Sequence, residues 1–177
     1  MKSHTPDLHL LDDVVAERVL AAMRTASEML ARAGVRHALC GGLAIGAHGY
    51  PRATKDVDFL VGSEAFVLHG GGVVTLGPGV PIQVNGISID HLSANETEPF
   101  LARALDNATE TAGVRVLGVE ALVYMKLRSP RPRDGVDVLE LIHAGLDTAG
   151  CERWLAEHAP DLVEKFRALV ADAWPEG

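Results

Sequence analysis

Residues 40–61 read CGGLAIGAHGYPRATKDVDFLV, and this stretch joins a glycine pair to two closely spaced aspartates. Gly41 and Gly42 follow a short apolar run and precede residues that favour a short helix, so we expect a strand, a tight turn and a helix in this order. Backbone amides at a glycine-rich helix start can approach a phosphate closely, and the helix end adds partial positive charge. The glycine pair therefore predicts a phosphate contact, although a tight strand-to-helix turn alone would also explain it.

The two aspartates stand at the start of the next apolar run, residues 56–61. Because side chains alternate across a strand, Asp56 and Asp58 share one face, while Val57 and Phe59 point to the other face and anchor the strand in the core. A rigid element would thus present two carboxylates together. Since Asp-x-Asp is also common in loops and at strand ends, its meaning depends on the residues around it.

A third carboxylate is expected on a later hairpin. Asn85 and Gly86 lie between two apolar runs, residues 80–84 and 87–92, and this pair is a strong signal for a tight two-residue turn. Asp90 falls on the polar face of the second run. Carboxylates on neighbouring strands can supply the oxygen ligands that Mg²⁺ or Mn²⁺ prefers, and two such cations stabilise an in-line phosphoryl displacement. The predicted catalytic and metal-binding residues are Asp56, Asp58 and Asp90.

Hydrophobic periodicity and turn residues predict the remaining elements. The mixture of expected helices and strands indicates an α+β fold, with a small mixed β-sheet flanked by helices and with further helices at the C-terminus. We expect one domain, residues 1–177, divided into an N-terminal helix (1–34), a catalytic core (35–118) and C-terminal helices (119–177). The expected helices are 10–32, 43–48, Ser63 to the Gly70–Gly72 run, 96–107, 119–127, a helix that begins at Arg133, 148–158 and 160–174. The helix from Arg133 should have Val136, Leu139, Leu141 and Ile142 as its apolar face. The expected strands are 35–40, 56–61, 80–84, 87–92 and 114–117.

Composition narrows the classes of function. The formal net charge of -8 argues against a broad basic face for nucleic acid, although a local basic patch can still hold an RNA end or a nucleotide. The two cysteines, Cys40 and Cys151, lack metal-ligand spacing, and we expect a small buried role for Cys40. The N-terminus does not read as a secretory signal, and no apolar run is long enough to cross a bilayer. We therefore expect a cytoplasmic protein without a membrane partner.

The order of these motifs resembles the polymerase-β-like nucleotidyltransferase superfamily. Its signature is a Gly-Gly or Gly-Ser pair, a short helix, Asp-x-Asp, and a third Asp on a later strand. Within the superfamily, the spacing Gly-Gly-x-Ala…Arg-x-Thr-x-Asp-x-Asp-Phe resembles the branch of the abortive-infection AbiEii toxins, which are the toxin halves of toxin–antitoxin pairs. The matching residues here are Gly41, Gly42, Ala44, Arg52, Thr54, Asp56, Asp58, Phe59 and Asp90.

A later motif extends the resemblance to residues 35–143. That branch carries a helical Lys followed by Arg and then Arg-Asp-x-x-Asp. The resemblance implies a nucleotidyltransferase fold and transfer of a nucleoside monophosphate from an NTP to an acceptor such as RNA, together with an antitoxin partner. Its later matching residues are Lys126, Arg131, Arg133, Asp134 and Asp137.

The resemblance also implies roles for individual side chains. Asp56 and Asp58 would bridge the metals, and Asp90 would bind the catalytic metal and help deprotonate the acceptor. For Asp134 and Asp137 we favour a simpler explanation, a helix N-terminus with favourable negative charge, over pairing with neighbouring arginines. The implied nucleotide-binding residues are Gly41, Gly42, Arg52, Thr54 and Lys126.

Other classes of protein fit less well. A phosphotransferase of the haloacid-dehalogenase type should carry Thr or Val two residues after the second Asp, where Leu60 stands, and no glycine pair should precede it. A glycosyltransferase with Asp-x-Asp would need a much longer nucleotide-sugar domain. The main alternative is a catalytically inactive domain of the same fold that binds a nucleotide or a partner protein.

Overall fold

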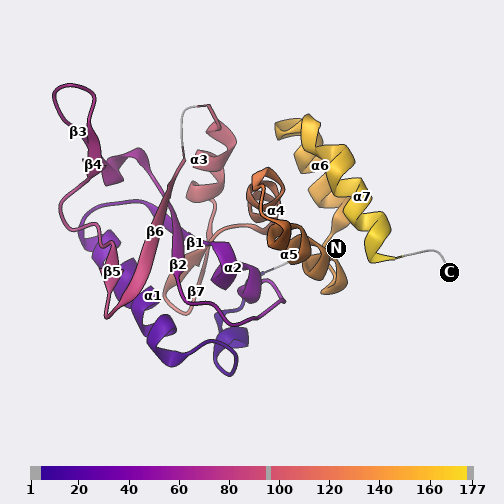
Figure 1. Cartoon of the computed structure of the whole chain (residues 1–177), viewed down its shortest axis with the longest axis horizontal. Helices are drawn as coiled ribbons and strands as arrows, with labels where there is room; N and C mark the ends of the chain where they lie inside the picture. The colour runs from indigo at the N-terminus through magenta and orange to yellow at the C-terminus, as the bar shows by residue number, and fades with distance from the viewer. Residues whose placement is uncertain (1–4, 95–96, 175–177) are drawn as a thin grey trace.

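The computed structural model describes residues 5–94 and 97–174, and its core is a mixed six-stranded sheet (Figure 1). The strand order is β5-β6-β2-β1-β8-β7. A separate two-stranded sheet pairs β3 with β4. The expected α+β class is confirmed. The strands are β1 (His37–Cys40), β2 (Val57–Val61), β3 (Phe66–Leu68), β4 (Val74–Leu76), β5 (Gln83–Val84), β6 (Ile87–Ser93), β7 (Thr109–Thr111) and β8 (Val114–Val116).

Helices cover the sheet and extend beyond it. The first long helix packs against β1, β2, β5 and β6, whereas the last four helices gather at the other end of the molecule (Figure 1). No helix among the described residues is long and apolar enough to span a membrane. The α-helices are α1 (Glu17–Arg32), α2 (Gly41–Ala47), α3 (Pro99–Asp106), α4 (Val119–Arg128), α5 (Pro132–His143), α6 (Thr148–His158) and α7 (Val163–Ala173), and the 3₁₀ turns are η1 (Leu8–Leu11), η2 (Ser63–Ala65) and η3 (Pro160–Leu162).

The central strand β2 joins two kinds of pairing. It runs antiparallel to β1 and parallel to β6, so the strand that carries Asp58 has hydrogen-bonded neighbours on both sides. Alternation fixes its orientation, because Val57 and Phe59 are fully buried. In β6, Ile87 and Ile89 are buried and Asp90 is exposed. Both strands therefore present their aspartates on the face away from these buried side chains.

The Asn-Gly hairpin forms as expected between β5 and β6. Asn85 and Gly86 both have positive φ, 48° and 80°, which is the backbone pattern of a type I′ turn. This turn twists in the same sense as the strands on either side. It therefore fixes the register in which β6 lies beside β2.

One expected helix is wrong, because residues 66–76 form a hairpin. Only Ser63–Ala65 makes a 3₁₀ turn, and β3 then pairs antiparallel with β4 across the glycine run. Phe66, Val67 and Leu68 are aromatic and branched residues that suit a pleated surface. A cross-strand partner segment after the glycines outweighs the weak helical pattern.

Element boundaries also differ from the expectation. The first long helix begins at Glu17 instead of residue 10, because Leu8–Leu11 forms a separate 3₁₀ turn, in which the Asp7 carboxylate accepts a hydrogen bond from the His9 amide. The helix expected from residue 96 begins at Pro99, and its expected start lies outside the described residues. The short strand β7, which pairs with β8, was not expected.

The buried face of α5 is shifted from the expected one. Val138, Leu141 and Ile142 are buried, whereas Val136 is 47% exposed and Leu139 is only partly buried. The helix also buries Asp134 and Asp137 on its inner side. Hydrophobic periodicity cannot predict this orientation, because two of the inward positions are acidic.

Candidate functional site

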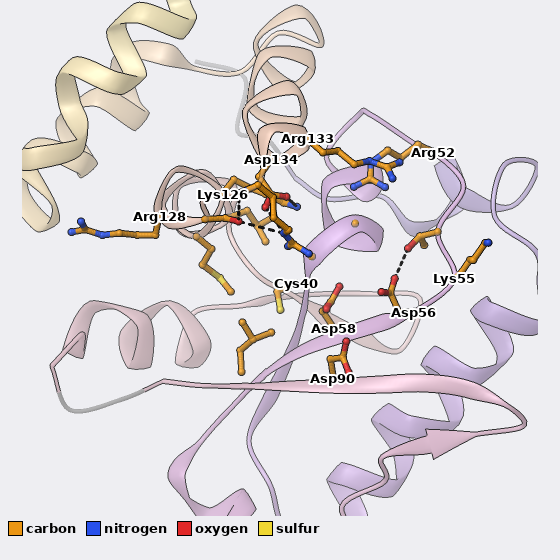
Figure 2. A pocket seen from close by; sticks show the side chains of 18 of the residues that line it. Cys40, Arg52, Lys55, Asp56, Asp58, Asp90, Lys126, Arg128, Arg133 and Asp134 are labelled. Carbon is orange, nitrogen blue, oxygen red and sulfur yellow. Dashed lines mark hydrogen bonds and ion pairs between the residues drawn. The ribbon is translucent and has the colours of Figure 1, made fainter.

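Three carboxylates stand together where β2 and β6 run side by side. Asp58 on β2 lies directly opposite Asp90 on β6, and Asp56 precedes β2 by one residue. Figure 2 shows Asp58 above Asp90, with Asp56 beside them. All three line a cleft of about 850 Å³ between the sheet and the C-terminal helices. The parallel register brings together aspartates that are more than thirty positions apart in the sequence.

The glycine at the start of α2 is required by the carboxylate beside it. Gly41 has φ +62°, and a Cβ built on it would lie 1.9 Å from Oδ2 of Asp58. Any larger residue would therefore be strained and would collide with the carboxylate. At Gly42 an added Cβ would lie 3.4 Å from Arg52 Nη2 and Thr54 Oγ1, which is close to ordinary contact. Positive φ and the Asp58 carboxylate thus require glycine at position 41, whereas neither requires it at position 42.

The acidic cluster carries excess negative charge. Burial, followed by the negative charges of Asp56 and Asp90, raises the pKa of Asp58 to about 6. Lys126 and Arg131 lower it in part. Ionisation of Asp58 at neutral pH therefore lowers the stability of the fold. Such perturbed carboxylates are common at sites that bind a cation or move a proton.

The cluster is not a complete metal site as it stands. In residues 5–94 and 97–174, no three His, Cys, Asp or Glu side chains are arranged to hold a metal ion. Asp56 instead accepts a hydrogen bond of 2.8 Å from the Thr54 hydroxyl. Mg²⁺ usually keeps several waters and binds one or two carboxylates together with substrate phosphates. The donor set and its excess charge therefore fit a cation that arrives with a phosphate ligand.

A buried ionic network forms the opposite wall of the cleft. Arg52 Nε and Nη2 each donate to Asp137 at 2.9 Å, a bidentate pair. Lys126 Nζ lies 2.7 Å from Asp134 Oδ1 and 2.8 Å from Asp137 Oδ2. Arg131 Nε donates to the other oxygen of Asp134 at 2.9 Å. Five side chains thus bind one another, from the loop before β2, from α4, from the α4–α5 connection and from α5, and we call them the Arg52–Arg131 network.

Three of the five side chains in this network are buried. Side-chain exposure is only 4% at Asp134, 1% at Asp137 and 9% at Lys126. Burial alone would raise the pKa of Asp137, but hydrogen bonds from Arg52 and Lys126 and their positive charges lower it below its usual value. For Asp134, the Lys126 and Ser129 hydrogen bonds and nearby positive charge likewise outweigh burial and lower the pKa. Both carboxylates are therefore ionised at neutral pH.

The explanation of Asp134 and Asp137 by a charged helix N-terminus alone is incomplete. Asp134 stands in the first turn of α5, but it also pairs with Arg131, the alternative considered from the sequence. Their side chains are buried in ion pairs with Lys126 and Arg52, which come from other parts of the chain. The sequence held one usable signal, because aspartates three positions apart share a helix face. It gave no sign of the partner Arg52, which lies 85 positions away.

Three residues beside the predicted site residues, Cys40, His48 and His91, have packing roles. His48 Nε2 donates to the Leu117 carbonyl at 2.9 Å, and Cys40 is fully buried with its pKa raised by burial. His91 donates through Nε2 to the Pro81 carbonyl. These residues support the fold around the cleft.

Every residue that the sequence predicted for the site lines this one cleft. The structure brings the glycine pair, the aspartates and the predicted basic and hydroxyl residues to the same space (Figure 2). Sequence reasoning missed Lys55 and placed Arg133 only in the later motif. Both are exposed cations of the same cleft that make no ion pair with any described residue. The predicted residues in the cleft are Gly41, Gly42, Arg52, Thr54, Asp56, Asp58, Asp90 and Lys126.

Comparison with known proteins adds a distant likeness of structure. No protein-family model and no curated protein matches the sequence. The chain is similar in structure to an antigenic nucleotidyltransferase-like protein from Paracoccidioides brasiliensis, with 15% sequence identity and a TM-score of 0.47. The match covers 92% of this chain and 99% of that chain.

Proposed function

We propose that this chain is a metal-dependent nucleotidyltransferase. An oxygen of the acceptor forms a new bond to the α-phosphorus of an NTP, the bond from that phosphorus to the β-bridging oxygen breaks, and pyrophosphate leaves. The observation that carries the proposal is the register of Asp58 and Asp90 across β2 and β6, with Gly41 packed directly against the Asp58 carboxylate. In this arrangement the backbone at the start of α2 can bind a phosphate while the neighbouring carboxylates bind a cation.

The three carboxylates have different roles in this reaction. Asp56, Asp58 and Asp90 would hold Mg²⁺ or Mn²⁺, which when bound offsets negative charge on the attacking and leaving oxygens. Asp90 is exposed in the cleft and accepts the proton of an acceptor hydroxyl as general base. Asp58 is half-buried and stays fixed against Gly41.

The nucleotide occupies the space between the glycine pair and the opposite wall. Gly41 and Gly42 contribute backbone amides, and Thr54 holds Asp56 in place. Lys126 has three N–H donors, of which Asp134 and Asp137 receive two, so one remains for a phosphate oxygen. Arg52 similarly keeps donors beyond the two that bind Asp137.

Free positive charge comes from the rim of the cleft. The charges of Arg52 and Lys126 are largely neutralised by the buried aspartates, whereas Lys55 and Arg133 have no acidic partner among the described residues. A triphosphate brings more negative charge than the paired cations can offset. Lys55 and Arg133 therefore supply the long-range attraction for it.

The class of acceptor rests on the resemblance noted in the sequence. Similarity to the AbiEii branch supports a toxin role, with RNA as acceptor and an antitoxin as protein partner. Four basic side chains line the cleft beside α4 and α5, and three of them, Lys126, Arg128 and Arg131, are paired with aspartates. The exposed Arg133 has no acidic partner among the described residues, and its charge supports a phosphate-bearing acceptor.

One observation favours a second candidate function. The three carboxylates do not form a complete metal site, and Asp56 is engaged by Thr54. A catalytically inactive domain that binds a nucleotide or a partner would have no need to assemble them. Binding without transfer separates this candidate from the enzyme.

The experiment incubates the purified chain with Mg²⁺ or Mn²⁺, each of the four NTPs labelled at the α-phosphate, and total RNA. The proposal predicts label on RNA or protein, lost in Asp58→Asn and Asp90→Asn. Glu110→Gln, an exposed acid on β7 outside the cleft, is the matched control and keeps full activity. NTP binding without label transfer in any mixture would support the inactive binding domain instead.

A further inference from the structure

The lining of the cleft changes its chemical character from one part to another. Near the glycine pair it is polar, since Arg52 and Thr54 lie there. The cleft is also lined by three apolar side chains, Leu92 from β6 and Leu122 and Met125 from α4. The roles proposed above for the phosphates and the cations use none of the three. A site for charged reactants alone therefore does not explain them.

Leu92 lines the cleft from the strand that carries Asp90. The two residues are two positions apart on β6, so their side chains share one face. Leu92 lies opposite Leu60 of β2, which is fully buried, yet Leu92 itself is 40% exposed. Single exposed leucines are ordinary on an open surface, but this one lines a cleft beside an acidic cluster. A bound substrate can cover the part of it that the fold leaves exposed.

Leu122 and Met125 bring apolar surface to the same cleft from α4. They are three positions apart and share a side of the helix with Lys126, which also lines the cleft. Leu122 is buried, whereas Met125 is only partly buried. Methionine is flexible and polarizable, so its side chain adapts to aromatic as well as to aliphatic groups. The cleft thus receives apolar side chains from the sheet and from a helix.

The order of the strands separates the two reactants. Across the sheet the order is β6, β2, β1, and α2 begins with Gly41 directly after β1. Asp58 therefore lies between the start of α2 on one side and Asp90 on the other, and Figure 2 shows Cys40, Asp58 and Asp90 in this order. In an in-line displacement the attacking and leaving oxygens lie on opposite sides of the phosphorus. With the pyrophosphate at the glycine pair, the acceptor approaches from Asp90.

The extent of the cleft shows where the rest of the acceptor lies. Alternation places Ser88, Asp90 and Leu92 on one face of β6. Asp90 and Leu92 line the cleft, whereas Ser88, which the structure also describes, does not. An acceptor whose hydroxyl meets Asp90 therefore extends along Leu92. The group that carries this hydroxyl needs an uncharged, apolar side.

A nucleoside at an unpaired strand end has both features. Its ribose supplies the hydroxyl, and its base supplies a planar face that packs against uncharged side chains. The phosphate that joins it to the preceding nucleotide needs a cation, and Arg131 is 75% exposed in the same cleft. Within the described residues only the backbone N–H and Nε of Arg131 donate hydrogen bonds, so its Nη groups can bind this phosphate.

We propose that Leu92 and Met125 determine the specificity for the acceptor, by holding the terminal base of an unpaired RNA end while its ribose hydroxyl meets Asp90. This inference rests on the nucleotidyl transfer proposed above. The ribose oxygen forms the bond to the α-phosphorus, Asp90 accepts the hydroxyl proton, and pyrophosphate leaves. A base-paired end is a poorer acceptor, because its terminal base must first leave the pair.

Initial rates with an NTP and a single-stranded RNA of about 12 nucleotides test the proposal. Leu92→Thr keeps a residue that suits a strand but removes the apolar contact, so the KM for RNA should rise about ten-fold while the KM for NTP stays unchanged. Leu92→Met restores an apolar side chain and should restore the KM for RNA. Leu68→Thr, at an exposed leucine outside the cleft, is the matched control. An unchanged KM for RNA in Leu92→Thr, or a rise in the KM for NTP instead, would overturn the proposal.

Binding measured without NTP separates this inference from the proposed function. Fluorescence anisotropy of the same RNA, labelled with fluorescein at its 5′ end, gives its Kd in the presence of Mg²⁺. Leu92→Thr and Met125→Gln should each raise this Kd about ten-fold, and a complementary strand annealed to the RNA should weaken its binding to the wild type.

The two measurements fail in different ways. Absence of label transfer by the wild type would refute the proposed function, whereas the expected pattern of Kd values would still support an apolar site for an RNA end. Equal Kd values for the wild type, Leu92→Thr and Met125→Gln would overturn the inference and leave the proposed function standing. Transfer of label to protein alone would also overturn it, since the acceptor would then be a protein hydroxyl.

Discussion

The Asp58 carboxylate occupies the space that a side chain at Gly41 would need, since a Cβ there would lie 1.9 Å from Oδ2 of Asp58. Gly41 also holds a positive φ of 62°, which is costly for any residue with a Cβ. The start of α2 and the acidic cluster are therefore built as one unit. Neither can change without moving the other.

Gly41→Ala should disrupt both folding and nucleotide binding. We expect a loss of unfolding free energy of about 2 kcal/mol or more, because strain at positive φ and displacement of Asp58 add together. Gly42→Ala is the matched control, since its Cβ would meet Arg52 and Thr54 at 3.4 Å and its φ is not positive. Urea denaturation measures both variants. Equal destabilisation of the two would contradict this account.

Asp58→Asn should stabilise the protein at high pH while removing activity. The folded-state pKa of Asp58 is raised to about 6 from 3.8, so between these pH values the folded state holds a proton that the unfolded state has lost. The free energy of unfolding therefore falls as pH rises through this window, by ~3 kcal/mol in total. Asp58→Asn has no carboxylate to ionise at this position, so its free energy of unfolding does not fall in this way.

Unfolding curves of the wild type and Asp58→Asn between about pH 3 and 8 measure the effect. The variant should be the more stable protein at about pH 8, and the difference should shrink as pH falls through about 6 and disappear only near about pH 3, where Asp58 is largely protonated in both states. Glu110→Gln, an exposed acid outside the cleft, should show no such pH-dependent difference. A constant difference at every pH would refute the raised pKa of Asp58.

The alternation of strands made much of this site predictable. Val57 and Phe59 had to be buried, so Asp58 had to face away from them, and the Asn85–Gly86 turn placed Asp90 on a neighbouring strand. These inferences need only local periodicity and turn chemistry. They located all three carboxylates before the sheet order was known.

The opposite wall was not predictable in the same way. Arg52 and Asp137 meet because α5 packs against α4, which in turn packs against α2, and no local pattern states which distant charges will pair. Burial of Asp137 violates the rule that acidic residues stay exposed, and only its cationic partners make it possible. The β3–β4 hairpin was missed because strand pairing across a glycine run outweighed local helix preference.

Asp137→Asn should destabilise the fold strongly. It leaves Arg52 and Lys126 partly buried without their shared counter-charge, and breaking one partner of a buried ion pair typically costs about 3–5 kcal/mol. Asp161→Asn removes the exposed partner of Arg128 and should change stability little. Urea denaturation distinguishes the two. Similar small effects would show that the Arg52–Arg131 network contributes little to stability.

Acid should remove the same contribution from the wild type. The pKa of Asp137 is lowered in the folded state, so its stabilisation is fully present above about pH 4 and is lost as pH falls through the folded pKa. The difference in unfolding free energy between the wild type and Asp137→Asn should therefore narrow only in strong acid. A difference that already narrows between about pH 5 and 7 would contradict the assigned ion pairs.

The reaction class is tested most directly by following the two ends of the triphosphate separately. Parallel reactions contain the same NTP labelled at the α-phosphate or at the γ-phosphate, with Mn²⁺ and the acceptor pool, and wild type is compared with Asp90→Asn. Nucleotidyl transfer predicts α-label on the acceptor and γ-label in pyrophosphate, with both lost in the variant. Transfer of γ-label to the acceptor, or equal transfer by Asp90→Asn, would contradict the account.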